Sequence, residues 1–185
     1  MKNGVYRRMI ETKRLTFRRW AEEDAAELYD LASHPEVGPH AGWPVHTSIE
    51  ESREVIKEYF TNDYTWALVS KQTGAIVGCM GYYPYEKSNI DIGRNDVEVG
   101  YWIGHPFWNQ GYCTEALAAL IDYCFDVKHF QTLWADYFVD NPASGRVMNK
   151  CGFTDTSKKN YCSRLLHGDD KPICVMKLEH PNHRA

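Results

Sequence analysis

Apolar residues recur along the chain with two different spacings, and these spacings predict a mixture of strands and helices. Runs typical of β-strands lie at residues 15–18, 65–70, 75–83, 97–103, 133–139, 153–161 and 173–178. Apolar positions at helical spacing lie at residues 22–31, 47–60, 111–125 and 142–151. This order of elements predicts an α/β (α+β) domain whose sheet is mixed but mostly antiparallel.

Turn-forming and capping residues mark the boundaries between these elements. Gly74 closes the segment between two predicted strands and supplies the positive φ angle of a hairpin turn. Residues 34–46 contain three prolines and two glycines, so we expect an irregular loop there. Thr47 and Ser48 follow as plausible caps of the next helix, and Gly152 stops the last one.

Composition narrows the class of protein. The 185 residues are 43% hydrophobic, which is enough for one well-filled core, and we therefore expect a single domain. The sequence has no run of 18 apolar residues and no apolar stretch behind its basic first residues, so we expect neither a membrane span nor a secretory signal, and a cytoplasmic location. A net charge of −4 without a block of Lys or Arg argues against nucleic acid as a partner.

The six cysteines and eight histidines do not form a metal-binding pattern. No Cys-x-x-Cys pair occurs, and each cysteine neighbours apolar sequence, so we expect reduced and mostly buried thiols. The nearest histidine trio, His34, His40 and His46, lacks the spacing of a zinc site. We therefore predict no metal. Stoichiometric zinc in the purified protein would favour the alternative, a cysteine/histidine metal protein.

The predicted strand 97–103 leads through Gly104, His105 and Pro106 into a helix that begins near Gly111. Such a turn directs backbone N–H groups towards one point, where the helix dipole adds positive potential, and this favours a phosphate group. Taken alone, the pattern fits a purely structural helix start equally well. Neither of the common nucleotide-binding glycine motifs occurs.

A second stretch, residues 140–153 (DNPASGRVMNKCGF), favours the phosphate site over the purely structural helix start. Together the two stretches resemble the GNAT superfamily of acyl-CoA N-acyltransferases, and in detail its RimJ/RimL-type branch of ribosomal-protein N-acetyltransferases. The resemblance includes residues 11–15 and Trp43-Pro44, and it covers about residues 10–178. It implies a GNAT domain at residues 9–180, with an N-terminal extension at 1–8 and a C-terminal tail at 181–185. It also implies about four helices around the sheet and a splayed central strand pair that holds acyl-CoA.

The resemblance further implies acetyl-CoA as co-substrate and assigns residues to it. The superfamily's pyrophosphate signature falls on residues 108–113, with Trp108 in place of Gln/Arg and Cys113 in place of Gly/Ala. Ile103 is expected to bind the pantetheine arm through its backbone. The residues expected to bind or adjoin the cofactor are Ile103, Trp108, Asn109, Gln110, Gly111, Tyr112, Cys113, Thr114, Asn141, Ser144 and Asn149.

Amine acylation requires a base, because an amine of ordinary pKa is protonated at neutral pH, and a donor to the carbonyl oxygen as that oxygen gains charge. Glu98 is the candidate base, acting through one water; the alternative is a solvent-facing strand carboxylate opposite Val97 and Val99. Ser144 is the candidate donor to the leaving thiolate, and its alternative role is a helix cap. The superfamily often has Tyr where this chain has Met148, which cannot donate a proton. An acyl-enzyme on Cys113 or Cys151 is disfavoured, since neither has a histidine nearby in sequence.

The acceptor site is expected to involve the loop at residues 34–46 and the tyrosines near residue 83. His40, Trp43 and Tyr83 are the candidate acceptor contacts, although a Trp in such a loop often fills a core instead. The expected function is transfer of an acetyl group to a primary amine, on a protein N-terminus or a small molecule, by direct attack in a monomer or homodimer. The alternative is a non-catalytic acyl-CoA-binding or sensing module of the same fold.

Overall fold

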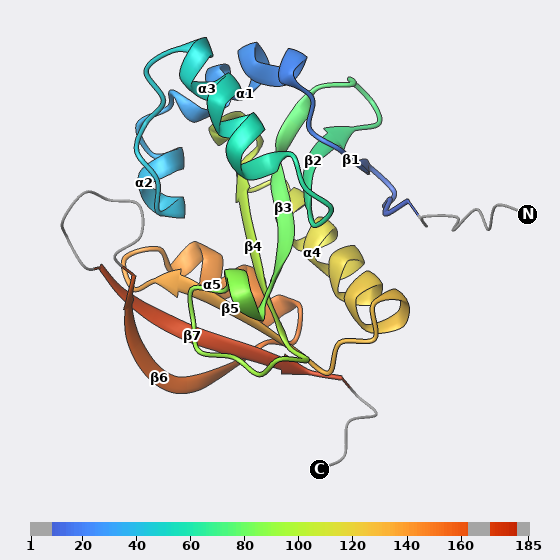
Figure 1. Cartoon of the computed structure of the whole chain (residues 1–185), viewed down its shortest axis with the longest axis vertical. Helices are drawn as coiled ribbons and strands as arrows, with labels where there is room; N and C mark the ends of the chain where they lie inside the picture. The colour runs from blue at the N-terminus through green and yellow to red at the C-terminus, as the bar shows by residue number, and fades with distance from the viewer. Residues whose placement is uncertain (1–8, 163–170, 181–185) are drawn as a thin grey trace, which may run out of the picture.

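The computed structural model describes residues 9–162 and 171–180 of the chain (Figure 1). Within these residues, strands pair into a 7-stranded sheet in the order β1-β2-β3-β4-β5-β7-β6. Neighbouring strands are antiparallel except β4 and β5, which are parallel. The strands are β1 (Leu15–Arg18), β2 (Thr65–Ser70), β3 (Ile76–Pro84), β4 (Val97–Ile103), β5 (Thr132–Phe138), β6 (Thr154–Cys162) and β7 (Lys171–Glu179). The expected mixed, mostly antiparallel sheet is therefore confirmed, while the expected extension and tail, residues 1–8 and 181–185, lie outside the described residues.

The helices follow the predicted order, with one addition. They are α1 (Ala25–Ala32), α2 (Val37–Ala41), α3 (Ile49–Val55), α4 (Tyr112–Asp122) and α5 (Pro142–Lys150), and α3 and α4 each continue into a π-helical turn. The addition is α2, which lies inside the segment expected to be a loop. Its Pro39 occupies the first turn, where no intrahelical N–H donor is required, and Gly42 ends the helix with a φ of 90°.

Helices cover both faces of the sheet (Figure 1). On one face, α4 packs on the central strands through Leu117 and Leu120, which are fully buried beside Val97 and Val99. On the other face, α1 and α3 enclose a second core around Leu28, Ile56 and Trp102. Side chains alternate along β4 between the two faces of the sheet, and helices cover both faces. Neither face of β4 is therefore exposed to solvent, although the start of its sequence alternates apolar and polar residues.

Local capping follows the sequence signals. The Ser48 hydroxyl accepts a hydrogen bond from Glu51 N at 3.1 Å and caps α3. In return, the Glu51 carboxylate accepts from Thr47 N and Thr47 Oγ1 at 2.6 and 2.8 Å. Among the described residues, no helix is long and apolar enough to cross a membrane.

Candidate active site

The parallel pair β4 and β5 separates soon after it begins. Backbone pairing joins Val97 to Leu133 and Glu98 to Trp134, and within the described residues these strands are not paired further along. Each strand continues to pair on its outer side, β4 with β3 as far as Ile103 and β5 with β7 as far as Phe138. The backbone edges of residues 99–103 and 135–138 therefore diverge, as Figure 1 shows, and we call this region the β4–β5 opening. Such edges offer N–H and C=O groups to an extended, amide-containing ligand.

The loop between β4 and α4, residues 104–111, follows Ile103, the last residue on the β4 side of this opening. Asn109 and Gly111 both have positive φ angles, of 59° and 77°. The first backbone bond of the helix joins Glu115 N to Gly111 O at 3.1 Å. The N–H groups of residues 112–114 precede that bond and point out of the helix start. This arrangement, together with the helix dipole, fits a pyrophosphate group.

Trp108 lies beneath this loop. Its indole Nε1 donates to the Ile103 carbonyl at 2.6 Å, and its ring packs against His105 with the ring centroids 4.8 Å apart. A carbonyl oxygen has two lone pairs, so Ile103 keeps acceptor capacity for a ligand. Trp108 therefore anchors the loop to the end of β4, while Asn109 and Gln110 are exposed.

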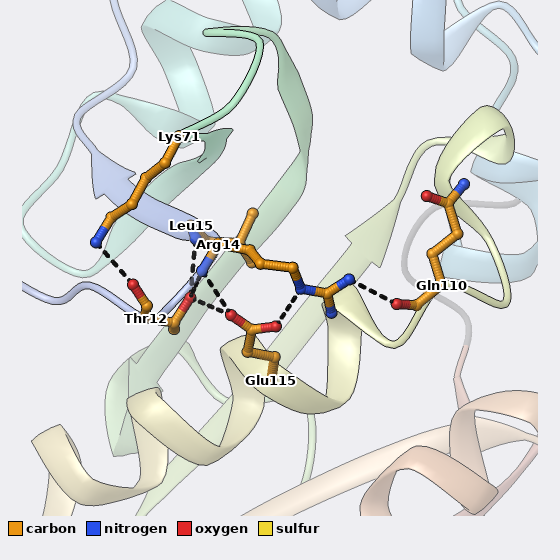
Figure 2. Close-up of polar contacts among 6 residues, drawn as sticks. All are labelled: Thr12, Arg14, Leu15, Lys71, Gln110 and Glu115. Atoms are coloured by element: carbon orange, nitrogen blue, oxygen red, sulfur yellow. Dashed lines mark hydrogen bonds and ion pairs between the residues drawn. The ribbon is translucent and has the colours of Figure 1, made fainter.

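A polar network ties the loop to β1, and sequence reasoning did not identify it (Figure 2). Arg14 Nε donates to Glu115 Oε2 at 2.6 Å, and Arg14 Nη1 donates to the Gln110 carbonyl at 2.9 Å. The other carboxylate oxygen, Glu115 Oε1, accepts from Thr12 Oγ1 at 2.6 Å and from Arg14 N at 2.9 Å. The Arg14 guanidinium also lies over the Tyr112 ring, 4.3 Å from its centroid. The Arg14 side chain thus contacts Gln110 just before the first turn of α4 and Glu115 at the end of that turn.

The ionisation of Glu115 reflects this network. Partial burial alone would raise the pKa of Glu115, but hydrogen bonds from Thr12 and Arg14 and the Arg14 charge outweigh it, so the pKa is lowered. The carboxylate is therefore held in its charged form.

Glu98 lies where β4 and β5 separate. Its side chain points away from Val97 and Val99, as alternation requires, but it is only 5% exposed, so the solvent-facing alternative is wrong. The segment between β3 and β4 covers it: Glu98 Oε2 accepts from Ser88 Oγ at 2.7 Å and from Asn89 N at 2.5 Å. Glu98 Oε1 has a longer contact, 3.3 Å from Asn89 Nδ2, and retains room for a further donor.

Ser144 lies in the first turn of α5, across the β4–β5 opening from β4. Asn141, not Ser144, caps this helix: its Oδ1 accepts from Ser144 N at 3.3 Å, and its Nδ2 donates to the His40 carbonyl at 3.1 Å. The Tyr101 hydroxyl, from β4, lies 3.0 Å from Ser144 Oγ and 3.2 Å from Ser144 O. Met148 is 1% exposed and belongs to the core, whereas Asn149 is exposed on α5.

The two cysteines near the site are not activated. Burial raises the pKa of the Cys113 thiol, and the neighbouring Cys151 adds to the effect; burial also raises the pKa of Cys151. Cys151 Sγ lies 3.6 Å from the Thr114 carbonyl. A thiol with a raised pKa stays protonated at neutral pH, which disfavours a covalent route.

The three expected acceptor contacts lie at different depths. The His40 ring is half-buried and lies 6.1 Å from the Trp108 ring, next to the β4–α4 loop. Trp43 packs on Trp102 with ring centroids 5.7 Å apart, as the core-filling alternative proposed. Tyr83 pairs with Glu98 across β3 and β4, and burial raises the pKa of its hydroxyl.

One buried histidine and a surface pair of histidines occupy places that the sequence did not indicate. His46 is 7% exposed, and its Nδ1 lies 2.8 Å from Ser52 Oγ, so it is a core residue. His34 stacks on His105 with ring centroids 3.9 Å apart, and Glu36 lies beside them. The ligand atoms of His34, Glu36 and His105 lie within 4.8 Å of one another on the surface. This contact joins the α1–α2 connection to the β4–α4 loop.

Comparisons with known proteins bear on the family and the fold of the chain. The family model described as "Acetyltransferase (GNAT) domain" matches residues 14–154. The curated protein p20 of Bacillus licheniformis, an uncharacterized N-acetyltransferase, is 29% identical over 151 residues, covering 78% of this chain and 81% of that protein. A solved "putative ribosomal-protein-serine acetyltransferase" of Vibrio cholerae is 25% identical, with a TM-score of 0.76 and coverage of 93% and 97% of the two chains. The microcin C7 self-immunity acetyltransferase MccE, solved with acetyl-CoA and AMP, is 23% identical, with a TM-score of 0.73 and coverage of 91% and 93%.

Proposed function

This chain belongs to the GNAT acetyltransferase family, and we propose that it transfers the acetyl group of acetyl-CoA to a primary amine by direct attack. The observation that carries the proposal is the β4–β5 opening, which joins an unpaired strand edge to the free N–H groups at the start of α4. The similarity to the ribosomal-protein-serine acetyltransferase structure supports the RimJ-like branch. It also makes N-terminal Ser peptides natural acceptors to test.

The residues of the opening divide into a phosphate end and a reactive end. The N–H groups of residues 112–114 would hold the pyrophosphate, and the edge of β4 up to Ile103 would bind the pantetheine amides. Glu98, where the strands meet, would accept the proton that the amine loses, through one water. Ser144, across the opening, would donate to the sulfur as the carbon–sulfur bond breaks.

Glu98 suits a base that acts through water. Its Oε2 accepts hydrogen bonds from Ser88 and from Asn89 N, and its Oε1 has a longer contact with Asn89 Nδ2, so the carboxylate has a fixed orientation and does not need to reorganise. Direct contact with a bulky amine would require displacing those donors, whereas a water needs only the remaining lone pairs of Oε1.

The proposal is tested by release of free CoA from acetyl-CoA across a panel of small-molecule amines, N-terminal peptides and polyamines. Turnover of one acceptor class is expected. Acetyl-CoA binding without turnover on the whole panel would favour the sensing module.

The role of Glu98 is tested by Glu98→Gln, which keeps an acceptor for Asn89 N. We expect kcat to fall by about a hundredfold, with acetyl-CoA affinity changed by less than about twofold, because Glu98 lies away from the phosphate end. Glu86→Gln, on the exposed turn after β3, is the control for charge alone. An unchanged kcat in Glu98→Gln would remove Glu98 from the mechanism.

A further inference from the structure

Ser144 is held through its backbone by Asn141 and through its hydroxyl by Tyr101, and Tyr101 has no role in the mechanism above. Asn141 Oδ1 accepts from Ser144 N, which fixes the backbone, while the Tyr101 hydroxyl lies 3.0 Å from Ser144 Oγ. A serine hydroxyl carries one proton and can accept two hydrogen bonds. If Tyr101 donates to Ser144 Oγ, the Ser144 proton is left for another acceptor. If it donates to Ser144 O at 3.2 Å instead, its own oxygen can accept the Ser144 proton.

The Tyr101 hydroxyl has a proton that it can donate to Ser144 Oγ. Burial raises the pKa of the Tyr101 hydroxyl well above its ordinary value, and nearby Cys113 adds to the rise, while the bond to Ser144 opposes it. The phenol therefore keeps its proton at physiological pH. The contact also spans the β4–β5 opening, because Tyr101 belongs to the part of β4 that is not paired with β5, and Ser144 belongs to the helix that follows β5.

Met148 on α5 is 1% exposed and has no proton to donate. The Tyr137 ring of β5 lies against Gly145 of α5. Among the described residues, the phenol whose hydroxyl lies within hydrogen-bond distance of Ser144 Oγ is Tyr101 of β4.

We propose that Tyr101 is a positioning residue that orients the Ser144 hydroxyl for donation to the sulfur of the acetyl-CoA thioester. The inference rests on the proposed function. As the carbon–sulfur bond breaks, the sulfur takes the electron pair, and the Ser144 O–H donates a hydrogen bond to the thiolate while Tyr101 O–H donates to Ser144. The amine proton leaves separately through water to Glu98, so neither hydroxyl needs to lose its own proton.

A purely structural tie between β4 and α5 would also be lost in Tyr101→Phe, so the test needs a readout specific to sulfur. CoA itself supplies one, because a donor to the thiolate lowers the pKa of the bound thiol. The ultraviolet absorbance of the thiolate is titrated from about pH 6 to about pH 10 in complexes of CoA with the wild-type protein, Tyr101→Phe and Ser144→Ala. Desulfo-CoA gives the sulfur-independent baseline and reports affinity.

We expect the pKa of the bound thiol to be higher in each variant than in the wild type, by about half a unit to one unit. Desulfo-CoA affinity should change by less than about twofold. An equal thiol pKa in all three proteins, with CoA still bound, would overturn the inference alone. Failure of the wild-type protein to bind CoA would overturn the proposed function, and the inference with it.

A double-mutant cycle in kcat, run on an accepted amine, adds an independent readout. Tyr101→Phe is expected to lower kcat by about fivefold to tenfold in the wild-type background. The same change should have almost no effect in Ser144→Ala and should regain its effect in Ser144→Thr, which restores a hydroxyl. Tyr123→Phe, at the far end of α4 beside Trp66, is the matched control. Equal effects of Tyr101→Phe in the Ala and Thr backgrounds would show a structural tie and refute the positioning role.

Discussion

Replacing Glu115 with Gln tests whether the Arg14 network shapes the cofactor site. The substitution preserves side-chain volume but leaves one acceptor oxygen where the carboxylate has two. In the variant, the amide oxygen at position 115 can accept from Thr12 Oγ1 and Arg14 N, as Glu115 Oε1 does in the wild type. The amide NH₂ group then faces Arg14 Nε, and two donors meet where Glu115 Oε2 accepts at 2.6 Å in the wild type. Arg14 would then turn away, and the Gln110 carbonyl would lose its partner at 2.9 Å.

The size of the effect follows from the bond and its exposure. A hydrogen bond to a charged group contributes about 1.5–3 kcal/mol when well shielded. The side chains of Arg14 and Glu115 are 39% and 22% exposed, so solvent screening reduces the expected loss in the free energy of unfolding to about 1–2 kcal/mol. For a chain of this length, that corresponds to a melting temperature lower by about 4 °C. CoA affinity should weaken by about threefold to tenfold, because the turn that presents the N–H groups is less well held.

The pH dependence gives the effect a signature. The folded-state pKa of Glu115 is lowered from 4.5, so the stability it contributes is fully present above that pH and is lost as the pH falls through the lower folded value. The difference between wild type and Glu115→Gln should therefore be constant near neutral pH and shrink in acid.

The assay is thermal unfolding with and without CoA, with Glu23→Gln as the control for removing an exposed acidic residue near the start of α1. The reasoning is refuted if Glu115→Gln and Glu23→Gln melt alike and bind CoA alike.

Two further predictions concern a glycine and a buried histidine. Gly111→Ala and Gly74→Ala place a side chain at φ angles of 77° and 74°, and each variant should lose about 1 kcal/mol of stability. Only Gly111→Ala should weaken CoA binding in calorimetry, since Gly74 lies in a hairpin turn with open space around it. Equal CoA affinities of the two variants would contradict the placement of the β4–α4 loop in the cofactor site. Burial lowers the pKa of His46 from 6.5, so the urea midpoint of the wild type should fall as the pH falls from 6.5 through the lower folded pKa. The urea midpoint of His46→Asn should fall less over the same pH range. Urea midpoints that fall in parallel for the two proteins would contradict this prediction.

The sequence predicted the elements of the fold well, because the signals involved are local. The period-two run at residues 97–103 and the helical spacing after Gly111 depend only on near neighbours, and both elements are present. Glu98 shows where local reasoning ends. Alternation correctly placed it opposite Val97 and Val99, but whether that face meets solvent depends on Ser88 and Asn89, which cover it from the preceding segment. The short helix α2 was missed because prolines and glycines normally indicate a loop, and Pro39 is acceptable in a first turn.

The residues that fix the candidate site are, for the most part, far from it in sequence. Arg14 and Glu115 are 101 residues apart, and Tyr101 and Ser144 are 43 apart. Taken locally, Arg14 is a charge before a strand, and Tyr101 is a large ring at a core-facing position of β4; nothing near either residue indicates its partner. Each becomes significant only after β1 is packed beside α4 and α5 is packed across the β4–β5 opening. Variants confined to residues 104–114 would therefore probe the proposed contacts to phosphate. The geometry that presents those contacts, and the hydroxyl proposed to meet the sulfur, are controlled from Arg14 before β1 and from Tyr101 in β4.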